Sequence, residues 1–138
     1  MNSQENLGKV LIVEDFAPLQ RNLAFLLYVS GFEVITADNG AFALNELRAE
    51  LPDLVICDVQ MPGMDGFALL AEIRSCPQWA HLPVIFTSCC YTLDDVVTAL
   101  ELGANDYIPK PYDLYDVLDS IQRVAPHLIP AVSQRIAG

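Results

Sequence analysis

Side chains able to bind a metal ion and move a phosphoryl group stand where apolar runs of this chain end. Asp58 closes one such run, and a stretch rich in proline and glycine follows it. Two further acids, Glu14 and Asp15, come directly after another apolar run. Thr87 ends a third run, and Lys110 follows a fourth. Three carboxylates, one hydroxyl and one ammonium are the groups needed to hold Mg²⁺ and transfer a phosphoryl group.

Each of these side chains has a possible chemical role and a plain structural one. As a nucleophile Asp58 would form an acyl phosphate, and a bound metal would offset the repulsion between its carboxylate and the incoming phosphate. Lys110 would neutralise one phosphoryl oxygen, and the Thr87 hydroxyl would donate to another. Taken singly, the acids read equally well as helix caps or turn residues and Lys110 as a surface cation. Their joint placement favours the phosphoryl site.

The elements that position these residues alternate between short apolar runs and amphipathic segments. This alternation predicts five strands, each followed by a helix. Asp65 is suited to begin the third helix as an N-cap, and Thr92 with Asp95 resembles a capping box that opens the fourth. The predicted strands are Val10–Val13, Glu33–Ala37, Leu54–Cys57, Val84–Phe86 and Asp106–Ile108.

Strands that alternate with helices and are apolar along their whole length indicate a parallel sheet covered on both faces. We therefore predict an α/β fold, the flavodoxin-like doubly wound (βα)5 arrangement, with a five-stranded parallel sheet in the order 2-1-3-4-5. The first and third strands are neighbours in that order. Glu14, Asp15 and Asp58 would then meet at the carboxyl edge, where such sheets bind ligands, with Thr87 and Lys110 beside them.

Length and charge restrict the classes of protein to consider. The 138 residues suit one domain, expected over 1–125, with 126–138 as a tail or linker. A net charge of −11 argues against direct nucleic-acid binding. No apolar run approaches the roughly 18 residues that a membrane helix needs, and the N-terminus has no signal-peptide core. We expect a cytoplasmic protein without a membrane partner.

The four cysteines show no zinc-type or CxxC spacing. We predict that all four are reduced packing residues, as free cysteines commonly are. A redox role for the adjacent pair Cys89 and Cys90 is the weaker alternative.

The chain resembles a receiver domain of the response regulators of two-component signalling, of the single-domain chemotaxis type. The resemblance covers roughly residues 9 to 124, nearly the whole chain. Four segments carry it: Val13-Glu14-Asp15, Asp58 to Gly66, Thr87-Ser88 and Gly103 to Pro111. The second and the fourth are highly specific when they occur together.

This resemblance implies a site that uses Mg²⁺. Asp58 would be the phosphoacceptor, and Thr87 and Lys110 would contact the phosphoryl group. It also implies a cis bond between Lys110 and Pro111. Glu14 stands where many relatives have aspartate, a mild departure. The implied metal ligands are Glu14, Asp15, Asp58 and the backbone carbonyl of Gln60.

The resemblance further implies a conformational switch and two kinds of partner. Thr87 would move toward the phosphoryl group and free space occupied by Tyr107, whose place near a strand end would let it face outward. A sensor histidine kinase or phosphotransfer protein would supply the phosphoryl group. A downstream protein would bind the face made by the fourth helix, fifth strand and fifth helix. That face is acidic, which suits a basic partner and argues against close, unpaired self-association. Its acids, set against Arg123 and Lys110, are Asp94, Asp95, Glu101, Asp113, Asp116 and Asp119.

The chain would not be an enzyme toward other substrates, since it would assist only its own phosphorylation and dephosphorylation. Hydrolysis requires a water in line with the bond from Asp58 to phosphorus. In this family, the side chains two positions after the acceptor and two after the threonine border that water; here they are Gln60 and Cys89. Neither side chain orders water as a carboxylate does, so slow hydrolysis is expected unless the rate is set elsewhere.

Two rival classes with related architecture or chemistry fit poorly. A flavodoxin-like cofactor binder needs a hydroxyl- and glycine-rich first loop, whereas this one begins with two acids. A haloacid-dehalogenase-type phosphatase carries its aspartate nucleophile on the first strand, in an Asp-x-Asp arrangement. Here the first strand leads to Glu14 and Asp15, and Phe16 and Ala17 follow, so this arrangement is absent. Two narrower alternatives stay open: an interaction module that works without phosphorylation, and the receiver half of a longer regulator.

Overall fold

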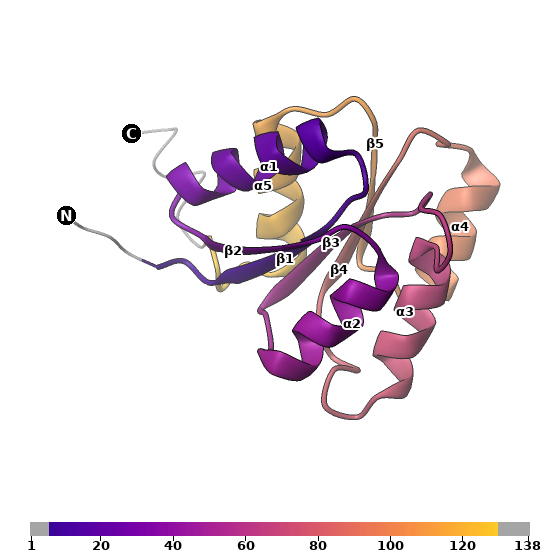
Figure 1. Cartoon of the computed structure of the whole chain (residues 1–138). Helices are drawn as coiled ribbons and strands as arrows, with labels where there is room; N and C mark the ends of the chain where they lie inside the picture. The colour runs from indigo at the N-terminus through magenta and orange to yellow at the C-terminus, as the bar shows by residue number, and fades with distance from the viewer. Residues whose placement is uncertain (1–5, 130–138) are drawn as a thin grey trace.

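The computed structural model describes residues 6–129, in which five strands alternate with five helices (Figure 1). This pattern confirms the predicted succession of βα units. The strands are β1 (Lys9–Val13), β2 (Glu33–Ala37), β3 (Leu54–Asp58), β4 (Val84–Ser88) and β5 (Asp106–Pro109). The helices are α1 (Ala17–Val29), α2 (Gly40–Ala49), α3 (Gly66–Ser75), α4 (Leu93–Glu101) and α5 (Leu114–Val124).

All five strands form one parallel sheet in the order β2-β1-β3-β4-β5, which confirms the predicted fold. Neighbouring residues of each central strand face opposite sides of the sheet, as the strand geometry requires. In β1, for example, Leu11 and Val13 pack on one side and Val10 and Ile12 on the other. Both sides are therefore buried, and the strands read as continuous apolar runs.

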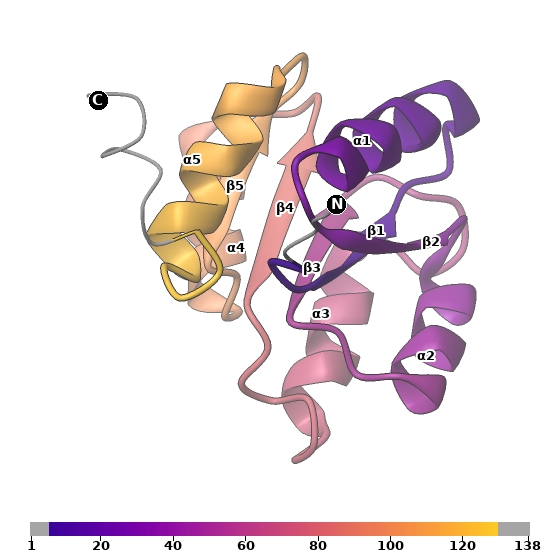
Figure 2. The same cartoon turned by 90° about the vertical axis from the view of Figure 1, so that its left-hand side faces the viewer.

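Two apolar clusters separate the sheet from its helices. One lies between the sheet and helices α2, α3 and α4, and the other between the sheet and helices α1 and α5 (Figures 1 and 2). Leu69 and Ile73 of α3 belong to the first cluster, and Leu27 and Ile121 to the second. The helices thus cover both faces of the sheet, and the loops after the strands surround its carboxyl edge.

Three strands extend one or two residues further than predicted at their carboxyl ends, and β1 begins one residue earlier, at Lys9. β3 includes Asp58, β4 includes Thr87 and Ser88, and β5 includes Pro109. The apolar pattern stops earlier because Asp58, Thr87 and Ser88 are polar, although they are buried, and the ladder of backbone hydrogen bonds continues. Asp58 pairs with Thr87 across the ladder. Asp58 and Thr87 therefore stand on the sheet itself.

Side chains fix the beginnings of α3, α4 and α5. The predicted N-cap Asp65 accepts a hydrogen bond from the Ala68 N–H at 2.9 Å. Thr92 caps α4 as expected, but only half of its capping box is present, because the Asp95 carboxylate accepts a hydrogen bond from the Thr92 hydroxyl and not from the Thr92 backbone N–H. The reciprocal box is found on α5, between Asp113 and Asp116.

The C-terminal boundary predicted after residue 125 stays a prediction. Leu128 and Ile129, just beyond it, are buried in the cluster under α1 and α5. Residues 130–138 lie outside the described part of the chain. Among the residues described, no helix has both the length and the hydropathy to cross a membrane.

The four cysteines are free, in agreement with the prediction that they are reduced. Cys57 is buried and Cys76 is partly buried, as packing residues should be. The packing role is wrong for Cys89 and Cys90, which are exposed in the loop between β4 and α4. A loop position after the last buried residue of a strand leaves a small apolar side chain without neighbours to pack on.

Candidate functional site

The carboxyl edge of the sheet brings together the acids that were expected to meet there. Glu14 and Asp15 follow β1, and Asp58 ends the neighbouring strand β3. Each of the three offers a carboxylate oxygen, and these atoms lie within 4.8 Å of one another. Glu14 and Asp58 are buried, while Asp15 is exposed. This is the spatial arrangement that the strand order predicted.

Lys110 reaches into this cluster from the end of β5. Its Nζ atom lies 3.0 Å from Glu14 Oε1 and 3.1 Å from Asp58 Oδ2. The bond that follows, to Pro111, is cis as expected. Three carboxylates and one ammonium leave a formal charge of −2, which one divalent cation would neutralise. The acids and Lys110 thus form one connected charged group.

Burial and charge act in opposite directions on this group. Burial raises the pKa of Glu14, and the nearby charge of Asp58 adds to the rise, against hydrogen bonds from Lys110 and from the Phe16 N–H. Burial alone would lower the pKa of Lys110, but its hydrogen bond to Glu14 and the charge of Asp58 raise it overall. Tyr112 also has a raised pKa, through burial and the charges of Glu14 and Asp58. The site therefore has a negative potential that Lys110 only partly balances.

The loop after Asp58 is held close to that residue. The Gln60 N–H donates to Asp58 Oδ1 at 3.2 Å. Gly66 lets α3 begin directly behind the loop, because a Cβ atom at this position would come within 2.8 Å of Val59 Cα and 2.9 Å of the Asp58 carbonyl. The two oxygens of the Asp58 carboxylate thus have different partners: Oδ1 has a backbone donor and Oδ2 has Lys110.

The donors present suit Mg²⁺. Hard divalent cations take carboxylate and carbonyl oxygens, and Mg²⁺ needs few protein ligands because it keeps several waters. Glu14, Asp15 and Asp58 supply three carboxylates with excess negative charge. The roles of these acids, and of the Gln60 carbonyl as a further ligand, stay predictions.

Thr87 and Tyr107, the predicted switch residues, are both buried. Thr87 lies beside Asp58 in the ladder between β3 and β4. The expectation that Tyr107 faces outward is wrong for this structure, since its side chain points inward and its hydroxyl donates to the Cys90 carbonyl at 2.6 Å. Its ring lies 6.4 Å from that of Phe86 and 5.6 Å from that of Tyr91. Burial raises the pKa of the Tyr107 hydroxyl.

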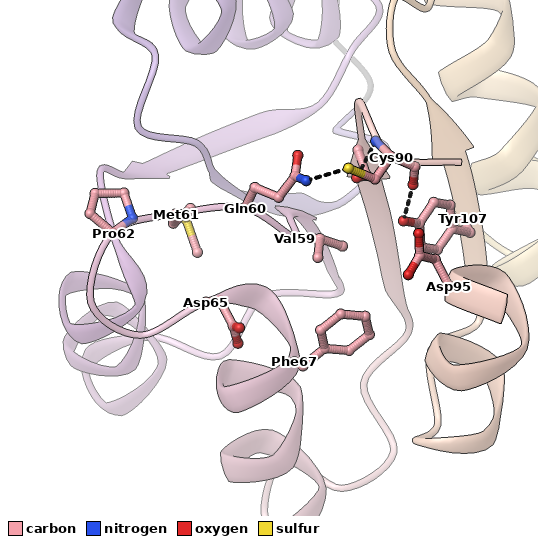
Figure 3. Close-up of a pocket in the computed structure, with 10 residues that line it drawn as sticks. Val59, Gln60, Met61, Pro62, Asp65, Phe67, Cys90, Asp95 and Tyr107 are labelled. Carbon is pink, nitrogen blue, oxygen red and sulfur yellow. Dashed lines mark hydrogen bonds between the residues drawn. The ribbon is translucent and has the colours of Figure 1, made fainter. Parts of the chain in front are cut away.

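A cavity of about 490 Å³ that borders the loop after Asp58 was not predicted (Figure 3). It lies between the loop after Asp58 and the start of α4. At its mouth the Gln60 carboxamide donates to the thiol of Cys90 (Figure 3). The expectation that Cys89 borders the water path stays a prediction. The sequence did not indicate the contact between Gln60 and Cys90, because nothing in two adjacent cysteines of a loop signals which one turns toward Gln60. The lining residues are Val59, Gln60, Met61, Pro62, Asp65, Phe67, Ser88, Cys90, Asp95 and Tyr107.

The surface of α4, β5 and α5 is acidic, as the sequence indicates, but it also carries exposed apolar side chains. Leu93, Val97 and Leu100 are exposed along α4 at helical spacing, which the sequence could have shown. A second hollow of about 360 Å³ lies near Tyr91 and reaches the acids of α5. Arg123 is paired there with Asp106 and Asp119, so it offsets part of the negative charge.

Sequence comparison with known proteins finds response regulators and their receiver domain. The model of the response regulator receiver domain matches residues 10–122. The probable transcriptional regulator ycf27 of Pyropia yezoensis is 41% identical over 104 residues, which are 75% of this chain and 42% of that protein. The DNA-binding transcriptional regulator NtrC of Escherichia coli K12 is 37% identical over 120 residues, which are 87% of this chain and 25% of that protein. The chain therefore spans less than half the length of these curated relatives.

Solved structures agree with the sequence comparisons. A putative response regulator from Chloroflexus aurantiacus superposes with a TM-score of 0.80 at 32% identity, covering 85% of this chain and 96% of that one. The chemotaxis protein CheY4 of Vibrio cholerae superposes with a TM-score of 0.81 at 29% identity, covering 84% and 97%.

Proposed function

This chain belongs to the response regulator receiver domain family of two-component systems, and on that premise we propose that it accepts a phosphoryl group on Asp58. The donor would be the phosphohistidine of a sensor kinase or phosphotransfer protein. The observation that carries the proposal is the contact of Lys110 with both Glu14 and Asp58 inside a cluster of three carboxylates. No other substrate is proposed, so the chain would assist only its own phosphorylation and dephosphorylation.

The transfer would exchange one phosphorus bond for another. An Asp58 carboxylate oxygen attacks the phosphorus atom in line with the nitrogen of the donor histidine, the phosphorus–nitrogen bond breaks, and the imidazole leaves with its electron pair. The product is an acyl phosphate on Asp58 and a free histidine. Lys110 Nζ lies 3.1 Å from Asp58 Oδ2 and would form an ion pair with a phosphoryl oxygen of the product.

Mg²⁺ bound by Glu14, Asp15, Asp58 and the Gln60 carbonyl would supply positive charge that offsets the repulsion between carboxylate and phosphoryl group. Thr87, which pairs with Asp58 across the ladder, would donate its hydroxyl to another phosphoryl oxygen.

Incubation with acetyl phosphate or beryllofluoride tests the proposal directly. Wild-type protein should gain one phosphoryl group by intact-mass measurement, and should bind beryllofluoride by NMR shifts around Asp58, only when Mg²⁺ is present. The matched control is Asp58→Asn, which keeps the shape of the side chain and removes the nucleophile. A wild type that does not react, or an Asp58→Asn protein that reacts equally, would refute the assignment.

The output would pass through Thr87 and Tyr107 to the surface of α4, β5 and α5. Movement of Thr87 toward the phosphoryl group would favour a different position for Tyr107, whose hydroxyl now bonds to the Cys90 carbonyl. The acids of this surface and the apolar stripe of α4 together suit a basic, amphipathic partner segment. Aromatic ring-current shifts of Tyr107, measured with and without beryllofluoride, would report the movement.

Two alternatives predict different results. A module that acts without phosphorylation would bind its partner equally well as wild type and as Asp58→Asn. The receiver part of a longer regulator is favoured by one observation, that the curated relatives are more than twice as long as the matched segment. The native size of the gene product, measured with an antibody against this domain, would decide that alternative.

A further inference from the structure

Cys90 connects three parts of the molecule through three hydrogen bonds. Its thiol accepts from the Gln60 carboxamide, on the loop that follows Asp58. Its N–H donates to the Ser88 hydroxyl oxygen at 2.9 Å, and its carbonyl accepts from the Tyr107 hydroxyl at 2.6 Å (Figure 3). Two of these bonds use the backbone of Cys90. Only the bond to Gln60 uses its side chain.

The side-chain bond determines where the Gln60 carboxamide lies. The backbone of Gln60 is already fixed by its N–H bond to Asp58 Oδ1, so the side chain is the free part of the residue. That side chain is exposed and lines the cavity, and without a partner it would sample several rotamers. In this structure the hydrogen bond to the Cys90 thiol holds the carboxamide against the loop between β4 and α4 (Figure 3).

A carboxamide held there is not free to order a water molecule near Asp58. In hydrolysis a water oxygen attacks phosphorus, the bond between phosphorus and the Asp58 oxygen breaks, and the water proton leaves with inorganic phosphate. The rate depends on how well that water is held in line. Gln60 is placed to donate to or accept from it once its carboxamide is released.

We propose that Cys90 is a positioning residue that slows loss of the phosphoryl group from Asp58 by holding Gln60 against the loop between β4 and α4. The inference rests on the proposed function, because it concerns the lifetime of the acyl phosphate. It assigns to Cys90 a role that neither the residue type nor its place in the sequence indicates.

The test compares variants that change only the thiol. Cys90→Ala removes the acceptor and leaves the backbone bonds to Ser88 and Tyr107 in place. We expect phosphate loss from Cys90→Ala to be faster by about threefold, the effect of losing one weak neutral hydrogen bond. Cys90→Ser keeps an acceptor and should restore most of the wild-type rate. Cys76→Ala is the matched control, a free cysteine at the C-terminal end of α3, and should leave the rate unchanged.

A double-mutant cycle separates positioning from a general loosening of the loop. In a Gln60→Ala background, Cys90→Ala should have no further effect, because the carboxamide it would release is already gone. The proton shifts of the Gln60 side-chain amide give a readout that needs no phosphorylation. They should move in Cys90→Ala and stay in place in Cys76→Ala.

Distinct results overturn the inference and the proposed function. An unchanged or slower rate in Cys90→Ala, or the same acceleration with and without Gln60, would overturn the role of Cys90 while Asp58 still reacts. Unchanged amide shifts in Cys90→Ala would also overturn it. A wild type that takes up no phosphoryl group would overturn the proposed function, and with it the rate effect assigned to Cys90.

Discussion

Replacing Glu14 by glutamine should stabilise the metal-free protein at pH 7, although the change removes one partner of Lys110. Glu14 is buried, and burial raises the pKa of its carboxyl group despite the hydrogen bond from Lys110. A raised pKa means that the folded state disfavours the charged form. Glutamine has the same shape as glutamate but no charge, so the folded state should be more stable with glutamine at this buried position.

Distances in the site give the size of the effect. Lys110 Nζ at 3.0 Å attracts Glu14 by about 5 kcal/mol if the effective dielectric constant is about 20. An Asp58 oxygen within 4.8 Å repels it by about 3 kcal/mol, and the exposed Asp15 adds about 1 kcal/mol in water-like surroundings. These terms nearly cancel, so the desolvation of the buried carboxylate decides the sign. We expect a gain of about 1–2 kcal/mol, or about 4–8 °C in Tm for a domain of this size.

Thermal unfolding in EDTA at pH 7 measures the difference. Glu72→Gln, an exposed acid on α3, is the matched control and should change stability by less than about 0.5 kcal/mol. The advantage of Glu14→Gln should depend on pH. Below the unfolded-state pKa, Glu14 is protonated in both folded and unfolded wild type, and the two proteins should converge. As pH rises through the raised pKa of the folded state, the wild-type penalty develops in full.

Addition of Mg²⁺ should reverse the order. A metal that binds only the folded state stabilises it in proportion to the logarithm of its concentration over Kd, and Glu14→Gln would bind it more weakly. If Glu14→Gln unfolded at a lower temperature than wild type in EDTA at pH 7, the reasoning would be refuted. Pairing with Lys110 would then outweigh burial.

Three further substitutions test other parts of the structure. Gly66→Ala should lower the free energy of unfolding by about 2 kcal/mol in urea titrations, because its Cβ would meet the Val59 backbone at 2.8 Å; no loss would show that α3 shifts freely. Tyr107→Phe removes the donor to the Cys90 carbonyl, so about 1 kcal/mol should be lost, and an equally stable variant would argue that water replaces the bond. Cys89→Glu should accelerate phosphate loss from the isolated protein, since a carboxylate can order water in line; an unchanged or slower rate would count against water positioning as the limit.

The sheet and its strand order could be predicted from the sequence because strands buried on both faces appear as short continuous apolar runs. β3 begins with four apolar residues and β4 with three, and parallel strands with right-handed connections allow few arrangements. Once the order was predicted, the meeting of Glu14, Asp15 and Asp58 required no further information. Backbone topology alone brings these three residues together.

What the sequence did not reveal depends on side-chain direction in loops and at strand ends. Tyr107 is buried because its hydroxyl finds the Cys90 carbonyl, a partner supplied by a loop whose conformation no periodicity encodes. Whether Cys89 or Cys90 turns toward Gln60 is decided by the same loop. The exposed stripe on α4 was readable at helical spacing, but its apolar residues look like core residues until the helix is seen to turn them outward.

The strand order also sets how far a change at Asp58 must travel. Asp58 pairs with Thr87 on β4, and the residue before Thr87 pairs with Tyr107 on β5. Parallel strands lie about 4.8 Å apart, so two steps across the sheet span about 10 Å. The route runs sideways through β4 alone, while β1 and β2 lie on the other side of β3. Strand β4 alone would therefore transmit a change from Asp58 to the surface of α4, β5 and α5. Its side chains would be the ones least free to vary in size.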